Sequence, residues 1–180
     1  MKKSIGSTLG LYPSLVTIVG AMNDDQPTWT LVAHVGIIGH DHVLVSLASN
    51  HFINHCIKET KQLTINLTSE DMLPKVDVAG SVSGNKGDKS HLFDYEKQGS
   101  YPILKEAPLT MKCNVEDIYK TDGFESFICT IDETLVEEQC LTNNKLDFNK
   151  LKPVLFSFSN YEYISTGRVL GKCLSFKKEA

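Results

Sequence analysis

The stretch that decides the fold runs from Gln26 to Ser90. It reads QPTWTLVAHVGIIGHDHVLVSL over residues 26–47, SNHFINHCIKETKQLTINL over residues 49–67 and AGSVSGNKGDKS over residues 79–90. The first segment carries two apolar strand patterns, and the second places a short helix before a strand that alternates apolar and polar residues. The third is a loop of Gly, Ser and Lys. This order of elements, more than any single residue, indicates what the chain forms and binds.

Working outward, the chain is mostly strands. Within the stretch we expect strands at Thr28–Ile38, His42–Leu47 and Gln62–Leu67, a helix capped by Asn50, and a short helix capped by Ser69 that ends before Pro74. Residues 80–99 lack periodicity and predict a long loop. The outer strand patterns are Leu15–Ala21, Leu109–Val115, Phe127–Val136, Val154–Phe158 and Tyr161–Ile164. With no repeat or linker, residues 1–180 predict one mainly β domain, a small barrel with a few short helices.

Composition places the chain among ordinary soluble globular proteins. Of its 180 residues, 41% are hydrophobic and 22% charged, which suits one domain with a real core. The net charge of −4 argues against nucleic acid or an anionic membrane as a partner. No apolar run reaches the ~18–20 residues of a membrane span, and the N-terminal MKKSIGSTLG lacks the apolar segment of a signal peptide. We therefore expect a cytoplasmic protein.

Cysteine and histidine spacing argues against a metal or disulfide framework. The five cysteines are odd in number, widely spaced and without a C-x-x-C pair, so neither a disulfide scaffold nor a zinc knuckle is expected. His51 and His55 share a helix face, but no carboxylate or cysteine is placed to complete a zinc pattern. No Ser-His-Asp arrangement is suggested either. We predict no metal and no catalytic side chain.

Two segments offer the groups that hold a phosphate. Ser46-Leu47-Ala48-Ser49-Asn50-His51 carries a strand into a helix start, whose free N–H groups and partial positive charge attract anions. Ser83-Gly84-Asn85-Lys86-Gly87-Asp88-Lys89 adds glycines and a lysine, Lys86 or Lys89, for a charge-assisted bond, although it lacks the P-loop spacing. The alternatives are a helix cap without a ligand for the first segment and a solvated loop for the second.

Together these segments resemble the flavin reductase-like family of FMN-binding split β-barrel proteins, from about Pro13 to Cys173. Pro13-Ser14-Leu15-Val16-Thr17 is similar to the family's first strand, and Pro27-Thr28-Trp29-Thr30 to its Pro-Asn-x-Met-Thr-like segment. IKETKQLTIN at residues 57–66 is similar to the family's I-K-E-T-x-x-F-x-I-N stretch, and Ser83-Gly84 with Asp88-Lys89 to its S-G-x-x-x-D-K loop. Each motif is common alone, and their shared order makes the resemblance specific.

The resemblance implies a split-barrel homodimer that binds FMN non-covalently near the subunit interface. It also implies hydride transfer from NAD(P)H to that FMN and on to an acceptor, chemistry that the flavin itself carries. One alternative is a flavoredoxin-like, FMN-binding electron carrier reduced by a partner protein. Another is a non-enzymatic barrel that has lost the flavin.

The resemblance also assigns site residues. Beside the ring and ribityl chain it places Thr28, Trp29, Thr30, Leu31, Val32 and Ala33, with His34 lining the pocket. Around the ribityl phosphate it places Ser46, Leu47, Ala48, Ser49, His51, Ser83 and Lys89. The single tryptophan, Trp29, is open to a second interpretation as a core or dimer-interface residue.

Three positions depart from the family pattern. His51 stands where Arg is usual, so a permanent charge becomes a pH-dependent one. Ile53 falls where the family often has Ser or Thr, and Asn54 is the residue that could compensate for the missing hydroxyl. Asp41-His42 replaces the usual Asp-Pro-Pro. These changes bear on phosphate affinity and on the choice of flavin.

Overall fold

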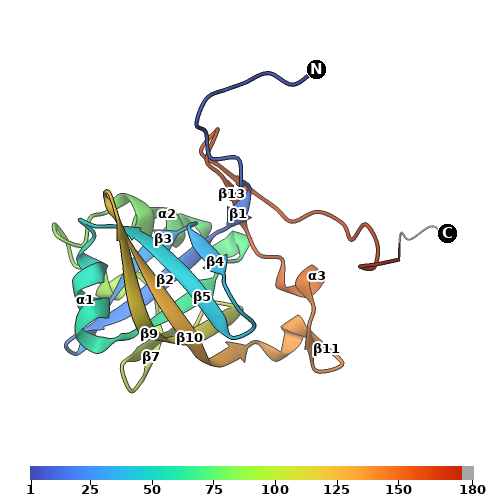
Figure 1. The fold of residues 1–180 in the computed structure, drawn as a ribbon. Coiled ribbons are helices and arrows are strands. Elements are labelled where there is room, and N and C mark those ends of the chain that lie inside the picture. Colours follow the sequence, from blue (N-terminus) through green and yellow to red (C-terminus); the bar gives the residue numbers. More distant parts are fainter. Residues whose placement is uncertain (176–180) are drawn as a thin grey trace.

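The computed structural model describes residues 1–175 and is built around one curled antiparallel sheet. Its strand order is β3-β2-β6-β9-β10-β5-β4, and the curl gives the barrel-like shape seen in Figure 1. The strands of this sheet are β2 (Thr17–Asn23), β3 (Gln26–Val32), β4 (Val35–Ile37), β5 (His42–Ala48), β6 (Gln62–Leu67), β9 (Leu109–Thr121) and β10 (Phe124–Val136).

Smaller elements surround the sheet. The remaining strands pair as β1 (Ser14–Leu15) with β13 (Leu155–Ser157) and β14 (Glu162–Ile164), β7 (Tyr95–Gln98) with β8 (Tyr101–Leu104), and β11 (Leu141–Thr142) with β12 (Lys145–Leu146). The helices are α1 (Phe52–Thr60), α2 (Leu73–Ser81) and α3 (Phe148–Leu151), with short 3₁₀ turns η1 (Glu70–Met72), η2 (Ser90–Leu92) and η3 (Glu138–Cys140).

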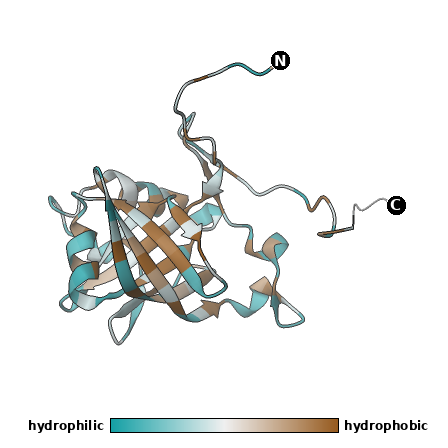
Figure 2. Cartoon of the chain, in the orientation of Figure 1, coloured by the Kyte–Doolittle hydropathy of each residue, from teal (hydrophilic) through white to brown (hydrophobic). Residues whose placement is uncertain are grey.

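Helix α1 and the curled sheet share the main core. Ile53, Cys56 and Ile57 lie on one face of α1 and are buried against the strands, as the spacing of an amphipathic helix requires. Figure 2 shows the matching contrast, with hydrophobic colour along the strands and hydrophilic colour on the exposed part of α1. The start of α1 is thereby fixed at one end of the barrel.

A second core lies between the sheet and α2, and Trp29 is its largest member. The indole packs edge-on against Phe93 and Tyr95. Gly20 pairs with Trp29 across β2 and β3, and a Cβ at Gly20 would collide with the indole ring. Because residue 20 has no side chain, there is room for the indole ring of Trp29 in this core.

The terminal segments leave the barrel. The chain before β1 and the chain after β14 both run away from the sheet (Figure 1), and they carry exposed apolar residues such as Leu11, Val169 and Leu170. No helix within residues 1–175 is long and apolar enough to cross a membrane.

The mainly β architecture with a few short helices is confirmed, and some element boundaries were wrong. Thr28–Ile38 is two strands, because the chain turns at Ala33 and His34 from β3 at one sheet edge to β4 at the other. The N-cap of α1 is His51 rather than Asn50.

The region after β6 agrees with expectation at Ser69, which is the N-cap residue of the short 3₁₀ turn η1 ending before Pro74, and differs beyond it. Helix α2 begins just before Pro74 and continues to Ser81, because proline in the first helical turn lacks only an N–H that would have no helical partner. The expected long loop of residues 80–99 is shorter, since η2 and β7 occupy its second half.

Candidate functional site

A pocket opens where the start of α1 meets the middle of β3 and the loop that follows α2. Its volume is about 220 Å³. It is lined by Thr28, Trp29, Thr30, Asn50, His51, Phe52, Ile53, Gly80, Ser81, Val82, Ser83, Gly84, Asn85 and Lys89. Three segments far apart in the sequence thus converge on one hollow, and each brings a different kind of polar group.

The start of α1 supplies backbone donors. His51 is the N-cap residue, and its side chain makes no capping hydrogen bond. The N–H groups of Phe52 and Ile53, which follow it, have no acceptor within the helix. Both residues line the pocket, so a bound anion would meet free donors and the positive end of the helix dipole.

Lys89 supplies a buried charge. The residue is only 6% exposed, and its Nζ donates one hydrogen bond, 2.9 Å long, to the carbonyl of Ala79. Within residues 1–175 no carboxylate forms an ion pair with it. Burial lowers the pKa of this ammonium, because removing a charge from water is costly. A buried cation without a counter-ion is a ready partner for an anionic ligand.

His51 is the second side chain of the pocket lining that can carry a positive charge. Its imidazole makes no hydrogen bond to any described residue, and it shares the pocket lining with Lys89. Burial lowers the pKa of His51, and the positive charge of Lys89 lowers it further. The pocket lining therefore favours the neutral form of the His51 imidazole.

The loop after α2 closes the pocket against α1. Asn85 donates from Nδ2 to the carbonyl of Asn50, 2.9 Å away. Gly84 lies so near Phe52 that a Cβ there would come within 3.1 Å of the Phe52 Cβ. The glycine-rich composition thus has a steric reason, since the loop backbone must approach the first residue of α1.

Six of the predicted site residues line this pocket: Thr28, Trp29, Thr30, His51, Ser83 and Lys89. The side chain of Trp29 points into the second core, so its interpretation as a core residue describes the structure better than a ring contact. The hydroxyls of Thr28 and Thr30 make no hydrogen bond within the described residues and remain available. Sequence reasoning missed the contributions of Gly80, Ser81, Val82 and Asn85, although the Gly/Ser-rich composition marked the loop.

The other predicted residues lie outside the pocket, most of them on the adjoining ends of β3 and β5. The side chains of Val32 and Leu47 are buried in the main core. Ser46 and His34 are joined by a backbone hydrogen bond of 2.9 Å. These strand ends continue away from the pocket. The remaining residues outside it are Leu31, Ala33, Ala48, Ser49 and Asn54.

His34 lies in an aromatic setting beyond β3. Its Nε2 is 2.7 Å from the hydroxyl of Tyr12, and its ring meets Phe124 edge-on. Phe124 in turn pairs with Ala48 across β10 and β5. A half-buried, partly apolar surface therefore continues from the pocket along the strand ends.

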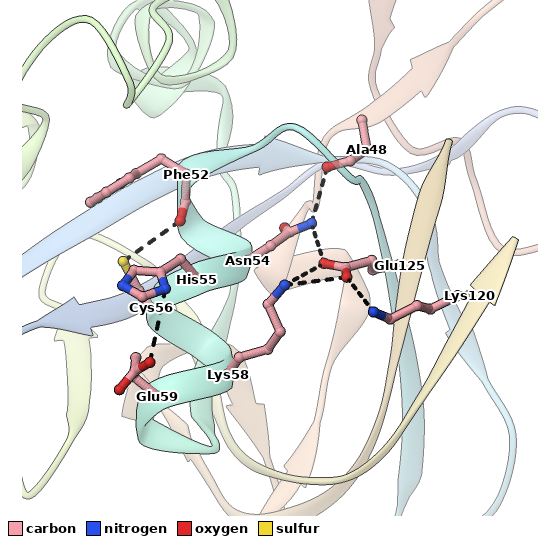
Figure 3. A network of polar contacts seen from close by, with 9 residues as sticks. All are labelled: Ala48, Phe52, Asn54, His55, Cys56, Lys58, Glu59, Lys120 and Glu125. Atoms are coloured by element: carbon pink, nitrogen blue, oxygen red, sulfur yellow. Dashed lines mark hydrogen bonds and ion pairs between the residues drawn. The ribbon is translucent and has the colours of Figure 1, made fainter. Parts of the chain in front are cut away.

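Asn54 does not compensate for the hydroxyl missing at Ile53. Its Nδ2 donates to the carbonyl of Ala48 and to Oε2 of Glu125, at 3.0 and 3.1 Å. Figure 3 shows this amide turned toward β10, where Glu125 also meets Lys58 and Lys120. The correction follows from helix geometry, because Asn54 faces the sheet and not the pocket.

Four of the cysteines, Cys56, Cys113, Cys129 and Cys140, are buried in the fold. Those in the described chain are free, and burial raises the pKa of the Cys56 thiol to about 11 and that of Cys129 to about 12. Neutral buried thiols are poor nucleophiles. Within residues 1–175 no group of three His, Cys, Asp or Glu side chains lies close enough to hold a metal ion.

The residues present fit the phosphate of a flavin mononucleotide. A dianion accepts hydrogen bonds and requires positive charge, and the pocket offers free helix N–H groups, hydroxyls and an uncompensated buried lysine. The hollow is sized for a phosphate and its first carbons, while the strand ends beyond it provide a partly apolar surface.

Several solved structures share the fold of this chain. Flavoredoxin from Methanosarcina acetivorans matches with a TM-score of 0.92 and 27% identity over 98% of this chain and 97% of that one. Flavoredoxin of Desulfovibrio vulgaris (Miyazaki F) matches with 0.89 and 29% identity over 99% and 100%. The styrene monooxygenase flavin reductase from Pseudomonas putida S12 shares the fold, with a TM-score of 0.72 and 17% identity over 89% and 95%.

The two comparisons with known sequences give different results. No curated protein matches the chain. The family model described as "Flavin reductase like domain" matches residues 9–165, a range that includes the pocket and the whole curled sheet. With this fold and this match, the chain belongs to the flavin reductase-like family and has its split-barrel architecture.

Proposed function

We propose that the protein is a cytoplasmic, FMN-binding oxidoreductase that accepts hydride from NADH or NADPH and passes electrons to an acceptor. The observation that carries FMN binding is Lys89, a lysine that is 6% exposed and has no carboxylate partner in the described chain. Folding leaves such a charge unpaired at a cost, and a phosphate in the adjoining pocket would offset that cost.

The residues divide the work of holding the cofactor. Lys89, the N–H groups of Phe52 and Ile53, and the hydroxyls of Thr28 and Thr30 would bind the phosphate. The adjoining ends of β3 and β5, joined through Ser46 and His34, would carry the ribityl chain and the ring. When bound, FMN supplies the hydride-accepting centre, so no acidic or nucleophilic side chain is required.

The test is the visible absorption of the purified protein under anaerobic conditions. We expect flavin bands after incubation with FMN, and loss of those bands on addition of NADH or NADPH. A protein that stays colourless with excess FMN would contradict cofactor binding. The loss of a phosphate site in an otherwise intact barrel would then be the better interpretation.

The second candidate is an electron carrier that receives electrons from a partner protein. The two flavoredoxin structures, similar over nearly the whole chain, favour this function by their names. The same experiment separates the two candidates. Flavin bands that persist with both nucleotides but bleach with dithionite would assign the carrier role.

We further propose that the protein is a homodimer with the flavin near the interface. The support is apolar surface: Ile37 on the edge strand β4 is 87% exposed, and Leu11 and Leu170 on the terminal segments are 83% and 78% exposed. Exposed apolar side chains on an edge strand and on extended terminal segments suit contacts with a second copy of the chain. Light scattering coupled to size exclusion should give about twice the chain mass of 20.0 kDa.

A further inference from the structure

Two side chains that can carry positive charge line the phosphate pocket, and they are held very differently. Lys89 is buried and anchored by the carbonyl of Ala79. The side chain of His51 is partly open to solvent at the helix start, and its imidazole has no hydrogen-bond partner in residues 1–175. Lys89 is thus held in one position, whereas the imidazole of His51 is free to gain or lose a proton.

The surroundings of His51 contain no acidic partner. On its own helix the neighbouring titratable group is His55, which lies beside Glu59. The pocket loop carries Lys86, Asp88 and Lys89, and the β9–β10 turn that meets Ser49 carries Asp122. All of these except Lys89 are exposed and make no hydrogen bond or ion pair with His51. Among these groups Lys89 is the one whose charge lowers the pKa of His51, in addition to the effect of burial.

Burial and the charge of Lys89 both lower the pKa of His51 in the free protein. A phosphate dianion bound between the two side chains reverses the sign of the nearest charge. An opposite charge within about 4–6 Å favours the protonated imidazole. The pKa of His51 in the complex is therefore higher than in the free protein.

We propose that His51 is a proton-linked ligand of the phosphate, so that binding of a phosphate ester in this pocket takes up one proton from solvent onto the imidazole. The inference rests on the proposed FMN binding and adds its regulation. Hydronium or the buffer acid gives up one proton, which forms an N–H bond at the unprotonated ring nitrogen of His51, and this N–H donates a charge-assisted hydrogen bond to the phosphate.

The consequence is a pH-dependent affinity. Between the two pKa values of His51, affinity falls as pH rises, by up to about tenfold per pH unit for one coupled proton. Above pH 6.5 the ligand phosphate itself is mainly dianionic, since its second pKa is about 6. Riboflavin lacks the phosphate, so its binding should not depend on pH in this range.

The experiment is isothermal titration of FMN into the full chain between pH 6.5 and 8.5, in phosphate-free buffers of different ionisation enthalpy. We expect net proton uptake with FMN and none with riboflavin. His51→Gln keeps a polar side chain but cannot be protonated, and should abolish the uptake. His51→Arg carries a permanent charge, and should bind FMN with little pH dependence over the same range.

A second measurement does not require flavin. Ring-proton NMR of His51, assigned with H51Q, should show its pKa rising on addition of inorganic phosphate. FMN binding without proton uptake, or uptake that persists in H51Q, would overturn the inference while leaving the proposed function intact. If FMN does not bind and phosphate leaves the His51 titration unchanged, both proposals fail. If only the phosphate effect is seen, the proton linkage holds and FMN is the wrong ligand.

Discussion

Two charged side chains near α1 are equally buried but differ in the partners that they have among the described residues. Lys89 and Glu125 are each 6% exposed. Glu125 accepts hydrogen bonds from Asn54 and Lys58 and lies 3.3 Å from Nζ of Lys120, as Figure 3 shows. Lys89 has one carbonyl, that of Ala79, and no carboxylate among the described residues.

The difference separates structure from function. Burying a charge is costly unless it is paired and hydrogen-bonded. Glu125 meets that condition within the fold, so its role is to hold α1 against β10. Lys89 has no such carboxylate partner among the described residues, which suits the binding of an anionic ligand. The comparison predicts that changes at Glu125 alter stability and changes at Lys89 alter ligand binding.

The largest expected effect is at Lys89. Lys89→Met keeps the aliphatic length and removes the charge, and should weaken FMN binding about a hundredfold, since a charge-assisted bond contributes ~1.5–3 kcal/mol. The unfolding free energy of the unliganded variant should not fall, because an uncompensated buried charge is gone. Flavin fluorescence titration and urea unfolding measure the two quantities. Unchanged FMN affinity in Lys89→Met would contradict the assignment of Lys89 to ligand binding, on which the comparison with Glu125 rests.

The matched change on the other side is Glu125→Gln. Loss of the buried carboxylate should lower the unfolding free energy by ~2 kcal/mol, below the upper range for buried pairs because Lys58 and Lys120 are partly exposed. FMN affinity should change by less than about threefold, because sites that share no partner affect one another only slightly. A variant that folds normally but loses FMN would show that Glu125 serves the pocket.

Lowering the pH should remove the contribution of Glu125 to the unfolding free energy. Burial raises its pKa, but hydrogen bonds from Lys58, Lys120 and Asn54 outweigh burial and leave the pKa below the ordinary 4.5. A lowered folded pKa means stability that is full above the unfolded pKa and is lost as pH falls through the folded pKa. The stability gap between wild type and E125Q should therefore narrow below pH 4.5. A gap that stays constant from pH 7 to 3 would contradict this assignment.

The smallest effect is expected at Gly84. Gly84→Ala would place a methyl 3.1 Å from the Phe52 Cβ, so the loop must shift by a few tenths of an ångström at the helix start. We expect FMN affinity to fall about fivefold, roughly 1 kcal/mol, with little change in unfolding free energy. Gly10→Ala, in the segment before β1, is a useful control for the general cost of replacing a loop glycine, because a Cβ there would meet no atom within 4 Å.

Local patterns located much of the fold and part of the site. β-branched runs identified the strands of the curled sheet, and the spacing of Ile53, Cys56 and Ile57 identified α1. His51, Ser83 and Lys89 were all predicted for one site and line one pocket. The strands and the helix could be predicted because each leaves a short-range pattern in the sequence, and the glycine-rich loop leaves one too.

The failures involve contacts between distant segments. The break at Ala33 and His34 exists because β3 and β4 lie at opposite edges of the sheet, which no local window reveals. Asn54 was assigned to the phosphate, but its partner Glu125 is 71 residues away. Trp29 was open to two interpretations until Gly20, Phe93 and Tyr95 were placed around it.

The sequence by itself determined the strand-rich class, the amphipathic helix and the glycine-rich loop, because backbone preferences and hydrophobic periodicity act over a few residues. Only the tertiary structure decided which charges are satisfied. Glu and Lys are residue types that usually lie on the protein surface, so the sequence does not mark Glu125 and Lys89 as buried. Their burial, and the presence or absence of an opposite charge, depend on how β10, α1 and the loop after α2 pack together, and electrostatic energy is set by those distances and by the surrounding dielectric.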